Sequence, residues 1–182
     1  MKNQQRQLHK KGALRSAKES AYVAVFVALL IAVQLALSVL PGVELVTVLF
    51  VAFAFTFGIG RGMVAATAFS IVRQLVFGFY PNVLILYLLY YNLLTLLFGA
   101  VGKRVKAPHK KLVFIVLLAC LCTVCFTLLD NVITPLWYGY TKRVAKLYFK
   151  ASLTFMLPQI ACTAITVSVL FLPLYGVFRR LK

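Results

Sequence analysis

Long apolar runs follow one another along almost the whole chain, separated by short polar or glycine- and proline-containing breaks. A helix needs about 20 apolar residues, within a range of roughly 17–25, to cross a bilayer. Of the 182 residues, 63% are hydrophobic, whereas roughly half is usual in soluble domains. A soluble domain of this length cannot hide the surplus, so the surplus must face lipid. The pattern predicts an all-α, polytopic membrane helix bundle.

The breaks divide the chain into six predicted transmembrane helices, at about residues 19–40, 44–58, 63–79, 82–99, 112–137 and 151–178. Spans two and three are short, and the alternative for them is a tilted or partly re-entrant pair. The first run lacks a small-residue cleavage site, so we expect a retained span and not a signal peptide. The predicted parts are a basic cytoplasmic tail (1–18), one six-helix membrane domain (19–178) and a basic C-terminal end (179–182).

The net charge is +17, and its placement indicates an orientation. Lys and Arg concentrate in the cytoplasmic segments of membrane proteins. If the N-terminus is cytoplasmic, then so are the basic tail, Arg61, the basic segment 103–111 and the C-terminal end, while the breaks after spans one and three carry no Lys or Arg. We therefore predict both termini on the cytoplasmic side of the cell membrane. The same placement argues against a nucleic-acid partner.

One basic segment departs from this rule. Lys142, Arg143, Lys146 and Lys150 lie between spans five and six, in a predicted loop on the outer side. Two interpretations stay open: the earlier segments alone set the orientation, or the loop is an outward-facing lid that attracts anions. Aromatic residues fit two interfacial belts, with Tyr22 and Tyr175 near the inner face and Trp137, Tyr138 and Tyr140 near the outer face.

The sequence carries no motif for catalysis or metal binding. Cys120-x-Cys122-x-x-Cys125 resembles a metal motif in spacing, but on a helix Cys120 and Cys122 point to nearly opposite sides, so we interpret these residues and Cys162 as packing residues. Walker A, H-E-x-x-H and G-x-S-x-G patterns are absent from the sequence, and these are the motifs of ATP hydrolysis, zinc proteases and serine hydrolases. We expect no enzyme activity, no cofactor and no metal.

Small residues recur along span one at a spacing of four, at Ala24, Ala28, Ala32 and Ala36. This spacing places them along one side of a helix. Small-residue stripes let helices approach closely in lipid. The stripe predicts a docking face for a partner, and the alternative is packing against another helix of the same chain.

Charged residues within or beside the apolar runs are limited to Glu44, Arg73 and Asp130. Such residues are costly in lipid and mark functional sites by default. With the predicted topology they all lie toward the outer side, as do Gln74, Asn131 and Gln159. Polar residues also follow helical spacing in spans three, five and six, and Tyr87 and Tyr91 share a face of span four. A structural ion pair of Arg73 with Glu44 or Asp130 is the alternative to a ligand pocket.

The chain resembles a known family of membrane proteins in its layout and in several short motifs. These are the basic tail, the alanine stripe, the run Pro41-Gly-Val-Glu-Leu-Val-Thr47, the run Phe57-Gly-x-Gly-x-Gly62 and the later Tyr80-Pro81. Together, over residues 20–178, they resemble the substrate-binding S component of energy-coupling factor (ECF) transporters. The resemblance implies capture of a water-soluble vitamin or related micronutrient near the outer face of a prokaryotic plasma membrane. It also implies docking, through the alanine stripe, on a membrane coupling (T) protein that two ATP-binding subunits drive.

The expected function is therefore substrate capture for uptake. Three alternatives stay open: a stand-alone secondary transporter for a small organic solute, a small lipid-modifying enzyme, and an assembly subunit that binds no ligand. Arg73 and the basic segment after span five favour a substrate with a carboxylate or phosphate. The expected substrate-binding residues are Glu44, Arg73, Gln74, Asn82, Tyr87, Tyr91, Asp130, Asn131, Trp137 and Gln159.

Overall fold

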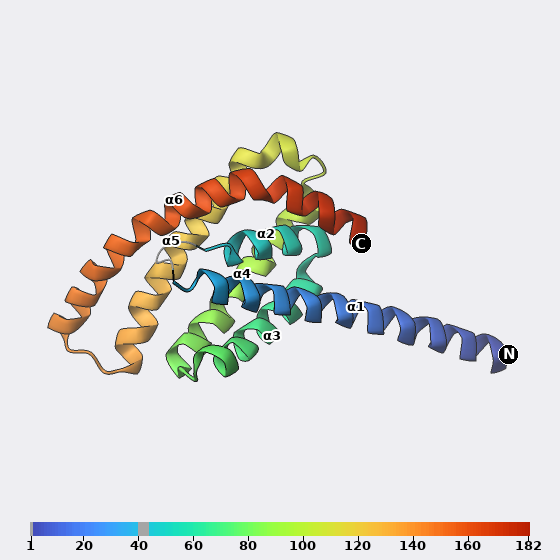
Figure 1. Ribbon diagram of the computed structural model, residues 1–182, viewed down its shortest axis with the longest axis horizontal. Helices are drawn as coiled ribbons and strands as arrows, with labels where there is room; N and C mark the ends of the chain where they lie inside the picture. The colour runs from blue at the N-terminus through green and yellow to red at the C-terminus, as the bar shows by residue number, and fades with distance from the viewer. Residues whose placement is uncertain (1, 40–43) are drawn as a thin grey trace.

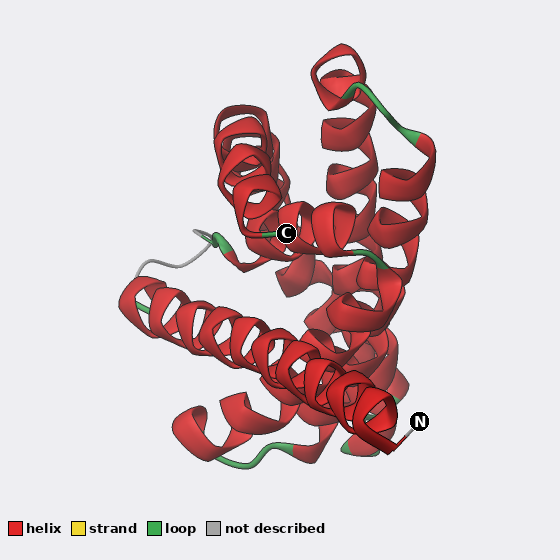
Figure 2. Cartoon of the chain, turned by 90° about the vertical axis from the view of Figure 1, so that its right-hand side faces the viewer, coloured by secondary structure: helices red, strands yellow, loops and turns green. Residues whose placement is uncertain are grey.

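The chain folds into a bundle of helices. The computed structural model describes residues 2–39 and 44–182, with side chains for residue 17, residues 19–39 and residues 44–182. The predicted break at Pro41-Gly42 lies outside the described residues. Over the described ranges the structure contains no strand (Figure 1, Figure 2). Its helices are α1 (Lys2–Leu37), α2 (Val46–Phe57), α3 (Ile59–Phe77), α4 (Pro81–Arg104), the short 3-10 helix η1 (Pro108–Lys111), α5 (Leu112–Trp137) and α6 (Lys142–Leu181).

Four of these segments are long and apolar enough to cross a membrane, and they give the chain the make-up of a multi-pass membrane protein. They are Glu19–Leu37, Pro81–Arg104, Pro108–Trp137 and Lys142–Leu181. Helices α2 and α3, which correspond to predicted spans two and three, are not among them. The all-α prediction is confirmed over the described residues, whereas six complete spans and cytoplasmic ends stay predictions.

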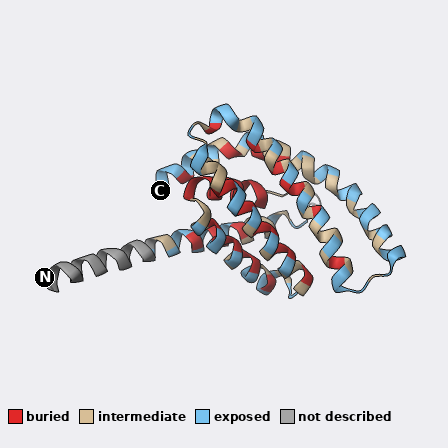
Figure 3. Ribbon diagram, turned by 180° about the vertical axis from the view of Figure 1, so that it is seen from behind, coloured by how far each residue is buried: buried red, intermediate tan, exposed pale blue. Residues whose placement is uncertain are grey.

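Helix α2 forms the centre of the bundle. Each of its 12 residues is buried, and it contacts all five of the other α-helices. Figure 3 shows this central helix as the most continuously buried part of the molecule. A helix of this length rises about 18 Å at 1.5 Å per residue, well short of a hydrocarbon core of about 30 Å. The structure therefore surrounds α2 with protein, which fits the re-entrant alternative better than a complete second span.

Aromatic rings fill the space around α2. Phe53 stacks on Phe26 of α1, with ring centroids 3.9 Å apart, and Phe50 stacks on Tyr91 of α4 at 4.6 Å. Phe55 meets Phe171 of α6 edge to face at 5.3 Å. Offset and edge-to-face ring pairs add to the packing energy of the apolar area they bury. They hold α1, α4 and α6 against the central helix.

Glycine and proline set the boundaries around α3. Gly58, between α2 and α3, has a φ of 86°, and Gly78, just after α3, has a φ of 96°. Backbone with positive φ is open to glycine at little cost. Pro81 then occupies the first position of α4, where its missing N–H has no intrahelical role. These residues explain why the chain turns sharply at the breaks that the sequence predicts.

The last helix begins earlier than the sequence predicts. Lys142, Arg143, Lys146 and Lys150 belong to the first turns of α6, so the predicted loop 142–150 is helical and the connection is only Tyr138–Thr141. Lys, Arg, Ala and Leu are strong helix formers, and the apolar count that placed the start near residue 151 overlooks them. The same reason explains why α1 begins at Lys2 and not near residue 19.

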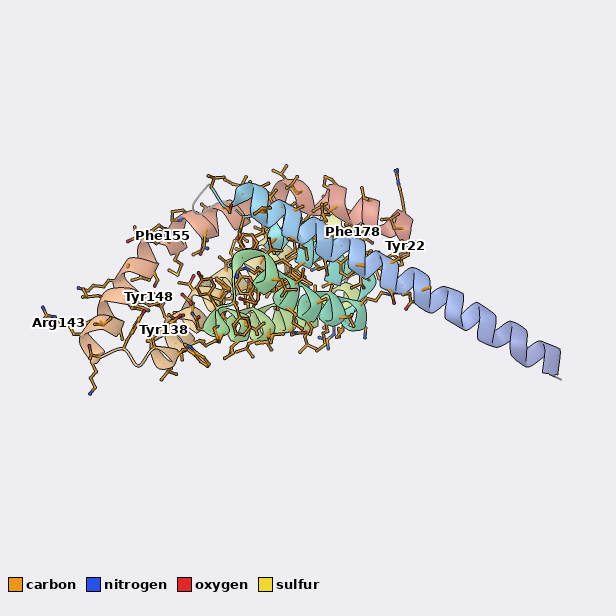
Figure 4. All side chains as sticks on the ribbon, turned by 60° about the horizontal axis from the view of Figure 1, so that its bottom comes forward. Tyr22, Tyr138, Arg143, Tyr148, Phe155 and Phe178 are labelled. Carbon is orange, nitrogen blue, oxygen red and sulfur yellow. The ribbon has the colours of Figure 1, made fainter. Side chains whose placement is uncertain are left out.

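The two ends of the bundle carry different polar and aromatic residues. Arg61 Nη2 lies 2.6 Å from Glu19 Oε1, which ties α1 to the beginning of α3. Figure 4 shows Tyr22 and Phe178 near this end and Tyr138, Arg143 and Tyr148 at the opposite end. Tyr22 and Tyr138, one residue from each predicted aromatic belt, therefore lie at opposite ends of the bundle.

Candidate functional site

A polar cavity lies between the end of α1, the beginning of α2 and the last turns of α3. It has a volume of about 280 Å³, and we call it the Arg73 cavity. Arg73 and Glu44 both line it, so the structure brings together two residues that the sequence predicts to share a site. The full lining is Gln34, Leu37, Ser38, Glu44, Leu45, Val46, Arg73 and Phe77.

Arg73 is held by aromatic rings and not by a carboxylate. Its guanidinium carbon lies 4.5 Å from the centre of the Tyr87 ring and 5.0 Å from that of Phe77. Nε and Nη1 are buried without a hydrogen-bond partner. The ion pair of Arg61 with Glu19 does not involve Arg73, and no described carboxylate lies within ion-pair distance of the Arg73 guanidinium. The alternative of a structural ion pair between Arg73 and Glu44 or Asp130 is therefore wrong for this structure.

Glu44 is placed by contacts with two helices. Its side chain accepts a hydrogen bond from the Thr47 hydroxyl in the first turn of α2. Its backbone N–H points at Cys162 Sγ of α6, 3.4 Å away. These contacts seat the segment before α2 against the middle of α6, so that the Glu44 side chain reaches the interior of the bundle.

A second polar cavity, the Asp130 cavity, lies between the C-terminal half of α5 and the N-terminal half of α6, with a volume of about 250 Å³. Tyr148 donates a hydrogen bond of 2.6 Å to Asp130 Oδ2, and Thr134 donates one of 2.7 Å to Oδ1. Two hydroxyl donors thus satisfy this carboxylate inside the protein. The full lining is Phe126, Thr127, Asp130, Tyr148, Ala151, Ser152, Phe155 and Gln159.

A very small void of about 10 Å³ lies between the two cavities. Glu44 lines both this void and the Arg73 cavity. Phe126 and Gln159 line both the void and the Asp130 cavity. The three spaces therefore form a row through the bundle, and side chains such as Gln159 separate them. Tyr91, Tyr90 and Thr123 complete the lining of the void.

The other predicted site residues lie beside these spaces and do not line them. The Tyr87 ring packs against the Arg73 guanidinium. Gln74 accepts a hydrogen bond of 3.0 Å from the Tyr80 N–H, while its Nε2 is buried without a partner. Asn82 donates to Thr134 Oγ1 at 3.2 Å, and Asn131 donates to Ser152 Oγ at 2.7 Å. Trp137 is 51% exposed and lines none of the cavities described.

Several cavity residues were missed by the sequence analysis, among them Gln34 and Tyr148. Gln34 lines the Arg73 cavity and donates a hydrogen bond of 3.2 Å to the Tyr87 hydroxyl. A polar amide inside the apolar run of span one is the signal that could have identified it. Tyr148 lines the Asp130 cavity, but it lay in the segment predicted as a loop, so no helical face was assigned to it.

An open apolar groove of about 1070 Å³ runs between α1 and α3, lined by Ala24, Ala28 and Ala32 of the alanine stripe. All four stripe residues are exposed, although Ala36 lies outside the groove lining. The buried residues of α1 are others, Val23, Phe26, Val27 and Leu30. The exposure of the stripe favours a docking face over packing against another helix of the same chain, and docking stays a prediction. Glu19 and Arg61 lie at one end of the groove.

The fold and these spaces define a class: a helical, multi-pass membrane protein with polar cavities among its helices and an apolar groove on its side. Comparisons with protein-family models, curated proteins and solved structures found no match to this chain.

Proposed function

We propose that this protein is the substrate-capturing membrane subunit of an ECF-type importer. It binds a small water-soluble vitamin or related micronutrient in the Arg73 cavity, near the outer face. The observation that carries the proposal is Arg73, which lines a polar cavity inside the bundle and has two buried guanidinium nitrogens without a hydrogen-bond partner. Intramembrane charges mark functional sites by default, and a few convergent polar groups in an apolar surround are typical of small-molecule sites.

The groove on α1 and α3 supports the second half of the proposal. A partner membrane protein packs against the exposed stripe, because small side chains let helices approach closely in lipid. The proposed partner is the coupling protein, which two ATP-binding subunits drive. The groove and the Arg73 cavity share no lining residue, so capture of substrate and docking of the partner use different surfaces of the chain.

Binding and uptake measurements test this proposal together. We expect the purified full chain to bind one of the water-soluble vitamins in calorimetric titrations at micromolar protein concentration. We expect uptake of that vitamin only in cells that also contain the coupling protein and both ATP-binding subunits. Uptake by the chain alone would support the stand-alone transporter instead. Absence of any binding across the panel would contradict substrate capture.

A further inference from the structure

The Arg73 guanidinium carries a positive charge that no described side chain neutralises. A guanidinium stays protonated in proteins, and a buried charge is costly unless it is paired and hydrogen-bonded. Nε and Nη1 of Arg73 are buried without partners, and Arg73 forms no ion pair with a described carboxylate. Arg73 therefore lines the cavity as a cation whose Nε and Nη1 have no carboxylate partner among the described side chains.

Aromatic rings hold Arg73, and they leave its Nε and Nη1 without a hydrogen-bond partner. Tyr87 and Phe77 contact the guanidinium within 4.5 Å and 5.0 Å of their ring centres. Such contacts stabilise the cation through the ring faces, whereas guanidinium N–H groups donate in the plane of the group. Gln34 holds the Tyr87 hydroxyl through Nε2 and keeps its own Oε1 buried and unpaired. The arrangement fixes the cation and leaves Arg73 Nε, Arg73 Nη1 and Gln34 Oε1 without partners beside the cavity that both residues line.

Glu44, the second charged residue of the cavity, limits which anionic group can bind beside Arg73. Glu44 lines the same space and repels a phosphate dianion more strongly than a singly charged group. A carboxylate matches the planar guanidinium in charge and geometry. Since Glu44 accepts only one hydrogen bond from a described side chain, it can also accept one from a donor on the same ligand.

Resting on the proposed function, we propose that the substrate is a small organic carboxylate and that Arg73 receives its carboxylate group. Gln34 and Glu44 then face the polar groups of the same molecule, and Tyr87 orients Arg73 as a positioning residue.

Retention of molecules from a mixture tests this directly. The purified full chain in detergent is incubated with the small-molecule fraction of a bacterial cell extract, washed and denatured, and released compounds are identified by mass spectrometry. Carboxylates are counted by the mass gain on methyl esterification. We expect one retained compound that gains at least one methyl ester. Arg73→Gln should lower its retention about 10- to 100-fold, the loss expected for a charge-assisted hydrogen bond.

Two further variants keep the result interpretable. Arg73→Lys keeps the positive charge and should retain more of the compound than Arg73→Gln does. A purely structural role of Arg73 does not predict this difference. Arg104→Gln removes an exposed arginine at the far end of α4 and should retain the compound as the wild type does. Unchanged circular dichroism and gel-filtration profiles show that each variant folds. If Arg73→Gln does not fold, the presence or absence of a carboxylate in the compound retained by the wild type tests the inference.

The outcomes separate this inference from the proposed function. A retained compound without a carboxylate, or one that a folded Arg73→Gln still retains, overturns the inference and leaves substrate capture standing. No retained compound at all overturns both.

Discussion

Gly102 shows how closely two helices approach in this bundle. A Cβ atom built on Gly102 of α4 would lie 2.2 Å from the Phe55 carbonyl oxygen of α2. That atom belongs to backbone in the fully buried central helix and has no room to move. At the scale of the residue, the absence of a side chain is therefore what lets α4 lie against α2.

We expect Gly102→Ala to destabilise the protein. Overpacking of this kind costs about 1–3 kcal/mol, so the thermal unfolding midpoint of the purified protein in detergent should fall. Gly176→Ala is the matched control, because a Cβ on Gly176 meets nothing within 4 Å and alanine favours a helix over glycine. Equal midpoints for the two variants would contradict the close approach of α4 and α2.

At the scale of the element, α1 carries both a buried set of residues and an exposed alanine stripe. Val23, Phe26, Val27 and Leu30 bury one side against the bundle. The alanine stripe lies next to these residues and borders the open groove, whose lining also includes Val23 and Val27. The long helix can therefore present a docking surface without disturbing the packing that holds it.

Filling the groove should separate docking from substrate binding. We expect Ala28→Trp combined with Ala32→Trp to abolish complex formation with the coupling protein and to abolish uptake, because two indoles occupy the space that a partner helix needs. Substrate binding by calorimetry should stay unchanged, since neither residue lines the Arg73 cavity.

Val25→Trp is the control for that experiment, because Val25 is 70% exposed on α1 but does not line the groove. It should leave co-purification with the coupling protein intact. If substrate binding falls together with uptake in the double variant, the stripe serves the folding of the cavity and not docking.

At the scale of the whole molecule, the polar cavities and the Glu19–Arg61 pair lie in different parts of the bundle. Glu44 and Arg73 line the cavity at the end of α1, and Asp130 lines the cavity between α5 and α6. The basic segment between α4 and α5 covers the last turn of α4 and the short helix η1. The positive-inside rule predicts a cytoplasmic location for that segment, so we expect the cavities to lie toward the outside.

Cysteine labelling in intact cells tests this orientation. In a chain with its four cysteines replaced by alanine, we expect Thr141→Cys to react with a membrane-impermeant maleimide. Lys106→Cys should react only after the cells are opened. Both positions are exposed, so burial does not explain a difference. Labelling of Lys106→Cys in intact cells would reverse the orientation and contradict a substrate site that faces outward.

The sequence by itself determined the all-helical class and the approximate positions of the helices, because apolar run length and the Gly and Pro breaks are local properties. The predicted span 112–137 coincides with α5, and the periodicity of four alone identified the alanine stripe. Glu44, Arg73 and Asp130 stood out because charges are costly in apolar runs. The starts of α1 and α6 were misplaced because helix-forming basic residues extend both helices beyond their apolar parts.

Only the tertiary structure decided which of these residues meet. Arg73 comes from α3, Gln34 from α1 and Glu44 from the segment before α2, and their meeting depends on how each helix is rotated and how deeply it packs. The burial of α2 on all sides also depends on tertiary packing. Its apolar sequence alone does not distinguish it from a helix that faces lipid. A cavity is a property of side chains from several helices, and no single run of sequence contains it.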